Sequence, residues 1–97
     1  MRDPAKAAQA VQEAKEAASK AEEALRTCKR SKRWDSRKAC LKIAGVAFRT
    51  TINAVEDASW YAGKDSYEAQ QAMLWQQIAQ QAALACEKLV DEAFNRP

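Results

Sequence analysis

Small apolar residues recur at alternating steps of three and four along the first part of the chain. Asp3 and Pro4 precede them and favour a helix start, because the Asp side chain accepts from free backbone N–H groups and Pro lacks a donor that would go unpaired. Steps of three and four place the repeating residues on one side of a helix. The pattern predicts a first helix over residues 4–31, with an apolar side formed by Ala7, Val11, Ala14, Ala18, Ala21, Leu25 and Cys28.

The same periodicity predicts a second helix over residues 36–62. Asp35 and Ser36 are its candidate N-caps, and Gly63 follows its last apolar residue, where glycine commonly ends a helix. A strand over residues 41–48 is the competing prediction, because β-branched residues and Gly45 lower helix propensity, but clean period-two alternation is missing. In a helix, Gly45 would mark a close helix crossing or a kink. The predicted apolar stripe is Cys40, Leu41, Ala44, Ala47, Phe48, Thr51, Val55, Ala58 and Ala62.

A third helix is predicted over residues 66–95, after a capping-box pattern at residues 65–68. Three helices joined by short turns make an all-α, antiparallel three-helix bundle, and a chain of 97 residues forms one domain over residues 1–97. The alternative is an intertwined dimer in which the first two helices are continuous, because residues 31–36 contain neither Gly nor Pro. The apolar side of the third helix is Ala72, Trp75, Ala79, Ala82, Cys86, Leu89 and Ala93.

Alanine makes the expected core thin. Apolar residues are 47% of the chain, but 22 of them are alanine. The first helix has only Val11 and Leu25 as large aliphatic residues on its apolar side, so we expect it to be the least firmly held. Trp60, Tyr61 and Tyr67 flank the second turn, and we expect these rings to fill the core at that end of the bundle.

The composition argues against an enzyme. Histidine is absent, which removes the commonest general base and zinc ligand, and two glycines leave little material for a phosphate-binding loop. We therefore expect no catalytic residue, no cofactor and no metal. The first residues lack the apolar segment of a secretion signal, no stretch is apolar enough to span a bilayer, and three cysteines do not form an even disulfide framework. We expect a cytoplasmic protein that does not enter the membrane.

The three cysteines fall at one level of the predicted bundle. If the first turn is centred near Trp34, Cys28 lies level with Cys40, and a second turn near Lys64 brings Cys86 to almost the same level. Three thiolates could bind a soft metal ion with a fourth ligand from outside. Packing as small apolar residues is the favoured interpretation, because neither histidine nor a Cys-x-x-Cys pair accompanies them.

Residues 26–42, here called the basic end, carry eight basic residues and one acidic residue. The local balance is +7, against −4 for the rest of the chain. An acidic protein surface and nucleic acid are both possible ligands, and a solvated end partly neutralised by Glu87, Asp91 and Glu92 is the third interpretation. We expect Arg33 and Arg37 to be at least partly exposed. The candidate binding residues are Arg26, Lys29, Arg30, Arg33, Trp34, Arg37 and Lys38.

Residues 69–86 form a stretch of 18 residues with six glutamines and no charge. An exposed helix face usually carries Lys and Glu for solubility, so an uncharged face suggests contact with another chain. The alternative is that the third helix is simply the central element, flanked by the other two. The candidate binding residues, here called the neutral face, are Gln70, Met73, Leu74, Gln77 and Gln81.

These features predict a non-catalytic protein-interaction module that binds a protein partner, for which an acidic surface is one option. Self-association as a homodimer is a further possibility. In composition alone the chain resembles small alanine-rich helical proteins of bacteria and phages, some of which are inhibitors or immunity proteins that occupy a partner's surface. The alternative function is a nucleic-acid-associated protein that uses the basic end.

Overall fold

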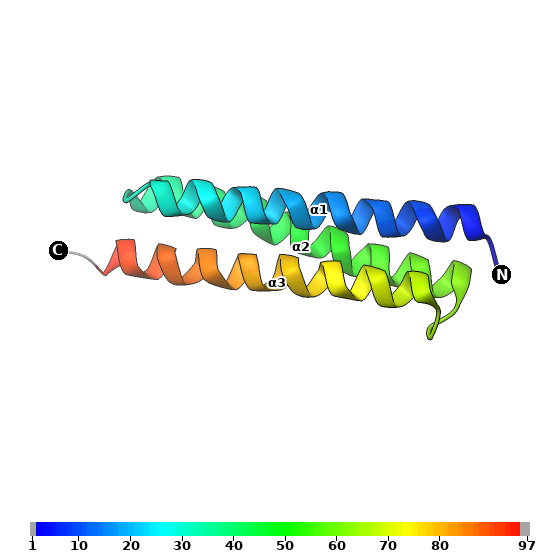
Figure 1. The fold of residues 1–97 in the computed structure, drawn as a ribbon. Helices are drawn as coiled ribbons and strands as arrows, with labels where there is room; N and C mark the ends of the chain where they lie inside the picture. Colours follow the sequence, from blue (N-terminus) through cyan, green and yellow to red (C-terminus); the bar gives the residue numbers. More distant parts are fainter. Residues whose placement is uncertain (1, 96–97) are drawn as a thin grey trace.

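Three long antiparallel helices lie side by side in the computed structural model, which describes residues 2–95 (Figure 1). Helix α1 covers Pro4–Arg30, α2 covers Trp34–Ala62 and α3 covers Tyr67–Phe94. Each helix packs against the other two, in a body 55 Å long and 16 by 14 Å across. The predicted all-α, antiparallel three-helix bundle is confirmed.

The helix starts follow the expected capping chemistry at α1 but differ in detail at α2 and α3. The Asp3 side chain accepts a hydrogen bond from the Lys6 backbone N–H at 3.2 Å, as predicted. Helix α2 begins at Trp34, earlier than predicted, with Arg33 as an N-cap whose side chain makes no capping bond. Asp35 instead lies in the first turn, where the positive end of the helix dipole stabilises a carboxylate.

At α3 the N-cap is Ser66 and not Asp65. The Ser66 hydroxyl accepts from the Ala69 backbone N–H at 3.1 Å and donates to the Gly63 carbonyl at 2.6 Å. One serine therefore caps α3 and closes the second turn. Gly63 ends α2 with φ +104°, a backbone conformation that favours glycine, so this part of the prediction is confirmed.

The first turn separates α1 from α2, so the prediction of a continuous helix is wrong. Ser31 has extended backbone angles (φ −96°, ψ 143°) and its N–H donates to the Cys28 carbonyl at 3.3 Å. The Arg33 N–H is held by the Ser31 hydroxyl at 3.3 Å. Serine thus supplies the hydrogen bonds of this turn without help from Gly or Pro.

Gly45 lies in the middle of α2, which runs without interruption from Trp34 to Ala62. The competing strand prediction is therefore wrong. A close helix crossing at Gly45 is also wrong, because a Cβ added there meets nothing within 4 Å. Gly45 therefore leaves open space on the surface of α2 and does not mediate contact with another helix.

The core consists almost entirely of small residues. Among the residues that the structure describes, the buried apolar side chains are fifteen alanines, three cysteines and Val90. Larger side chains such as Trp75, Leu25 and Phe48 are half-buried and pack against these alanine clusters from their margins. Small residues allow the helices to approach closely but bury little apolar area.

The prediction that aromatic rings fill the core beside the second turn is wrong. Trp60 is 68% exposed and Tyr67 is 74% exposed, while Tyr61 is half-buried with the Lys6 ammonium 5.3 Å from its ring centre. Helices that meet through alanine leave no room for a ring between them. This end is instead tied by a backbone hydrogen bond, 2.9 Å long, from the Asp3 N–H to the Tyr61 carbonyl.

We expect α1 to exchange its backbone amide hydrogens faster than α2 and α3 in native conditions. Of the large, partly buried residues that pack against the core clusters, α1 contributes Leu25 alone, so the opening of α1 exposes the fewest large apolar side chains. The others are Leu41, Phe48 and Val55 from α2, and Trp75, Ile78 and Leu89 from α3. Hydrogen exchange followed by NMR tests this, and uniform protection across the three helices would contradict it.

Candidate functional site

Most of the predicted basic-end residues are exposed around the first turn. They come from the end of α1, the turn itself and the start of α2, and they are Arg26, Lys29, Arg30, Arg33, Trp34 and Lys38. Few of these cations are paired with an acidic side chain. Arg33 pairs with Asp35 at 3.1 Å, and both side chains are largely exposed, so this pair adds little stability.

Trp34 does not stand free at the end of the bundle. Its ring lies 6.0 Å from the ring of Phe94, which comes from the last turn of α3, and the Lys38 ammonium lies 4.6 Å from the Trp34 ring centre. The aromatic pair remains partly accessible, because Phe94 is 70% exposed. The basic end therefore presents two rings beside several cations.

Arg37 is buried, which corrects the prediction that it is an exposed binding residue. Only 6% of its surface is accessible. Its Nε donates to the Ser31 carbonyl and its Nη1 to the Leu89 carbonyl, both at 2.7 Å, and Glu92 lies 3.8 Å from Nη1. A buried guanidinium needs such acceptors. Arg37 therefore ties the first turn to the end of α3 and is not available to a partner.

The sequence did contain a signal for this role. Arg37 is three residues before Cys40 and seven before Ala44, so it lies on the apolar stripe of α2. An arginine on such a stripe near a turn is placed to donate to carbonyl groups that the turn leaves free.

The three cysteines lie in one core cluster with Ala24 and Ala44, as the register predicted, and all three are free and buried. Burial, followed by the neighbouring Cys28 thiol, raises the pKa of Cys86 to about 12. Burial and then Cys40 raise the pKa of Cys28. The Cys28 and Cys86 thiols are therefore protonated at neutral pH, and all three buried cysteines pack as small apolar groups. Within residues 2–95, no set of three acidic or cysteine side chains is arranged to hold a metal ion.

All five predicted residues of the neutral face are exposed on α3. Leu74 is 53% exposed at its centre, beside a groove of about 780 Å³ that reaches Val55 and Ser59 of α2. A second depression, of about 320 Å³, continues along α3 past Leu74 to Ile78 and Gln81. The neutral face therefore borders a long groove that is uncharged along α3 and carries Lys64 and Asp65 at its end beside the second turn.

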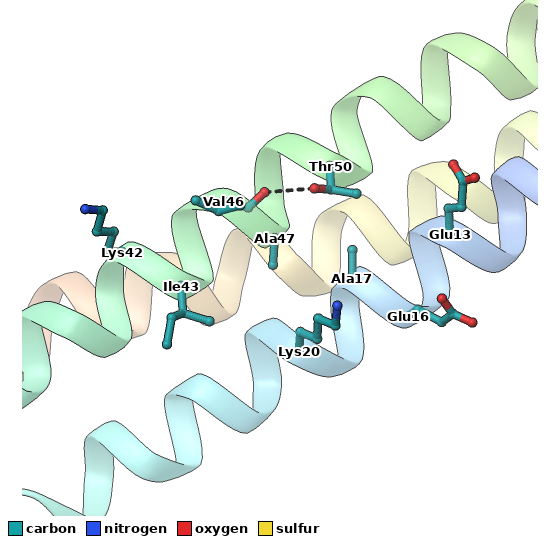
Figure 2. A pocket seen from close by; sticks show the side chains of 9 residues that line it. All are labelled: Glu13, Glu16, Ala17, Lys20, Lys42, Ile43, Val46, Ala47 and Thr50. Carbon is teal, nitrogen blue, oxygen red and sulfur yellow. Dashed lines mark hydrogen bonds between the residues drawn. The ribbon is translucent and has the colours of Figure 1, made fainter.

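Sequence analysis missed a second exposed apolar region, between α1 and α2. Ile43 and Val46 project from α2 beside a groove of about 430 Å³ (Figure 2). Both residues fall between the positions of the predicted stripe, at Leu41, Ala44 and Ala47, which is the signal that could have identified them.

No family model matches the chain, and no curated protein or solved structure is significantly similar to it. Among residues 2–95, no helix combines the length and the apolar character that a membrane span requires. The function must therefore be inferred from the surfaces described above.

We expect Arg37→Ala to lower the free energy of unfolding by about 3 kcal/mol, because the half-buried Ser31 and Leu89 carbonyl groups lose their charged donor and the buried side chain leaves a cavity. Lys38→Ala, at an exposed neighbouring position, should change it by less than about 0.5 kcal/mol. Urea denaturation of both variants measures the difference. Similar values for the two would show that Arg37 does not hold this end together.

Stability should decline as the pH rises from 9 towards 12. In the unfolded chain Cys86 ionises near 9.0, whereas in the folded chain its pKa is about 12, so the native state is favoured fully below pH 9 and loses this advantage above it. The contribution is about 1.4 kcal/mol per pH unit in that window. Denaturation at pH 8 and pH 10.5 should show a steeper loss for the wild type than for Cys86→Ala, and equal slopes would contradict the assignment.

Proposed function

We propose that the protein is a non-catalytic interaction module that binds a protein partner through the neutral face of α3. The observation that carries this proposal is the inverted distribution of apolar side chains. Among residues 2–95, the core contains alanine, cysteine and Val90, while nine large apolar residues are exposed. They are Trp34, Ile43, Val46, Trp60, Tyr67, Met73, Leu74, Leu84 and Phe94.

The α3 surface has the composition of an interface core. Such cores are depleted in charge and enriched in aromatic residues and methionine. Met73, Leu74 and Leu84 are each about half exposed on α3, and Tyr67 stands at its start. Met73 and Leu74 lie in the stretch that carries no charge from residue 69 to residue 86. A helix face that only contacts water usually carries charged residues in place of exposed apolar residues and glutamines.

The same surface indicates the chemistry of the partner. Glutamine amides both donate and accept, so Gln70, Gln77 and Gln81 can meet polar groups of either kind without burying a charge. The groove beside Leu74 offers space for apolar side chains from the partner. We expect a helical or extended segment with an uncharged, largely apolar surface.

The proposed mode of action is occupancy of a partner's surface, as in inhibitors and immunity proteins. A rigid three-helix body can present one face without a conformational change, which limits the entropy lost on binding. Three free thiols in the core suit a reducing compartment, so we place this activity in the cytoplasm.

A second candidate function is nucleic-acid binding at the basic end. The observation that favours it is the accessible Trp34 and Phe94 pair beside Lys38 and the exposed arginines, since bases stack on aromatic rings and phosphates pair with cations. The two functions differ in their dependence on salt, because phosphate contacts weaken steeply as salt increases and uncharged contacts do not.

The test is capture of the partner from a lysate of the native host, followed by mass spectrometry. Leu74→Lys with Gln77→Lys should reduce capture at least about tenfold, because a charge without a partner enters the interface core. Ala5→Lys with Ala8→Lys adds the same charge on the exposed side of α1 and should retain capture.

Capture should also survive nuclease treatment and 0.5 M salt. Loss of capture in Arg30→Glu with Arg33→Glu, or after nuclease, would contradict the use of the neutral face and support the basic end. Circular dichroism confirms that each variant is folded, which is expected because all these positions are exposed.

A further inference from the structure

We propose that the groove between α1 and α2 is the interface of an antiparallel homodimer. This inference is independent of the proposed function, because the groove is lined by residues of α1 and α2 and by none of the neutral face on α3. A dimer formed here leaves both neutral faces free.

The groove is continuous along most of the bundle. Three depressions of about 180, 430 and 220 Å³ follow one another between α1 and α2. The first two share Glu13, and the second and third share Lys20 and Ile43. A single neighbouring body can therefore occupy all three.

The middle of the groove is apolar. Ala17 and Ala47 form its floor, and Ile43 and Val46 are 55% and 49% exposed at its edge. Figure 2 shows Ile43 directed into the gap between the two helices. Burial of these two exposed aliphatic side chains against another surface would be favourable.

The charges around this apolar centre are partly separated by sign. Glu13 and Glu16 lie towards one end, whereas Lys20 lies near the middle and Lys42 at the other end (Figure 2). Asp57 and Lys6 line the groove at the end beyond Glu13, and Glu23 lines it beside Lys20 in the other half. Asp57 and Lys42, at opposite ends of the groove, are therefore placed to pair between two copies.

Two copies related by a twofold axis that crosses the groove at right angles bring opposite charges together. The core clusters place Ala14 with Ala54 and Ala21 with Ala47, so the middle of the groove lies beside Thr50. Rotation about that point brings Glu16 opposite the partner's Lys20, and Lys42 opposite the partner's Asp57. Each contact occurs twice, as in any isologous dimer.

A parallel arrangement of the two copies is disfavoured by charge. It would place Lys42 against the partner's Arg26 and Glu13 against the partner's Asp57, so like charges would meet at both ends. By the same register, the antiparallel arrangement brings two like pairs level, Glu13 with the partner's Glu23 and Lys6 with the partner's Arg30, beside its two opposite pairs. The pair of Glu13 with the partner's Glu23 supplies a test, because its removal should strengthen the dimer.

The available surface is sufficient for a stable dimer. A standard interface takes about 800 Å² from each partner. This is about an eighth of the 6556 Å² accessible surface of the chain, whereas one side of a three-sided bundle contributes about a third. A second copy is the occupant that this groove fits, since it places an opposite charge against Lys42 and another against Glu16.

Sedimentation equilibrium over a concentration series tests the proposal. The wild type should show a monomer–dimer equilibrium. Lys42→Glu and Asp57→Lys should each raise the dissociation constant about tenfold, and the double variant should restore it. Within one chain these residues are about 22 Å apart along α2, so restoration requires contact between two copies.

Glu23→Lys should lower the dissociation constant at least about threefold, because it pairs with the partner's Glu13. The Leu74→Lys variant serves as a control and should dimerise like the wild type. The proposal is overturned if the wild type remains monomeric at 1 mM, if the double charge exchange fails to restore association, or if Leu74→Lys abolishes the dimer.

Discussion

The distance between the helices is the constraint on which the rest of this structure depends. Alanine at almost every buried position lets three helices approach closely over their length of about 40 Å, and that closeness leaves little volume for a large side chain between them. Large apolar residues are consequently displaced to the margins and the surface. The same closeness explains the exposure of Trp60 and Tyr67. Where the helices meet through alanine, the space between them is too small for an aromatic side chain.

Periodicity was sufficient to predict the helices, their antiparallel order and the common level of the three cysteines, because each depends on spacing alone. The neutral face was also predictable in exposure, since Leu74 and its neighbours lie opposite the alanine seam. The role of Arg37 was not predicted. A charged side chain is usually exposed to solvent, whereas the position of Arg37 on the apolar stripe of α2 buries it. Capping by Ser66 and not Asp65 depends on a one-residue shift that a sequence pattern does not resolve.

The neutral face and the α1–α2 groove lie on different parts of the bundle and need not compete, because their lining residues are distinct. The groove does reach the basic end, since Lys42 belongs to both. A dimer through the groove would present two neutral faces in opposite directions. Such a molecule could hold two partner chains at once, or bind a repetitive partner more tightly than either face alone.

The alanine core also shapes how stability depends on temperature. The heat capacity change of unfolding follows the apolar area that becomes exposed, and a core of methyl groups exposes less of it than a core of leucines. The free energy of unfolding should therefore vary gently over a wide range of temperature, with a broad thermal transition and weak cold denaturation. A protein that acts by remaining folded gains from this shallow curve, because its binding surface stays nearly constant in shape as conditions change.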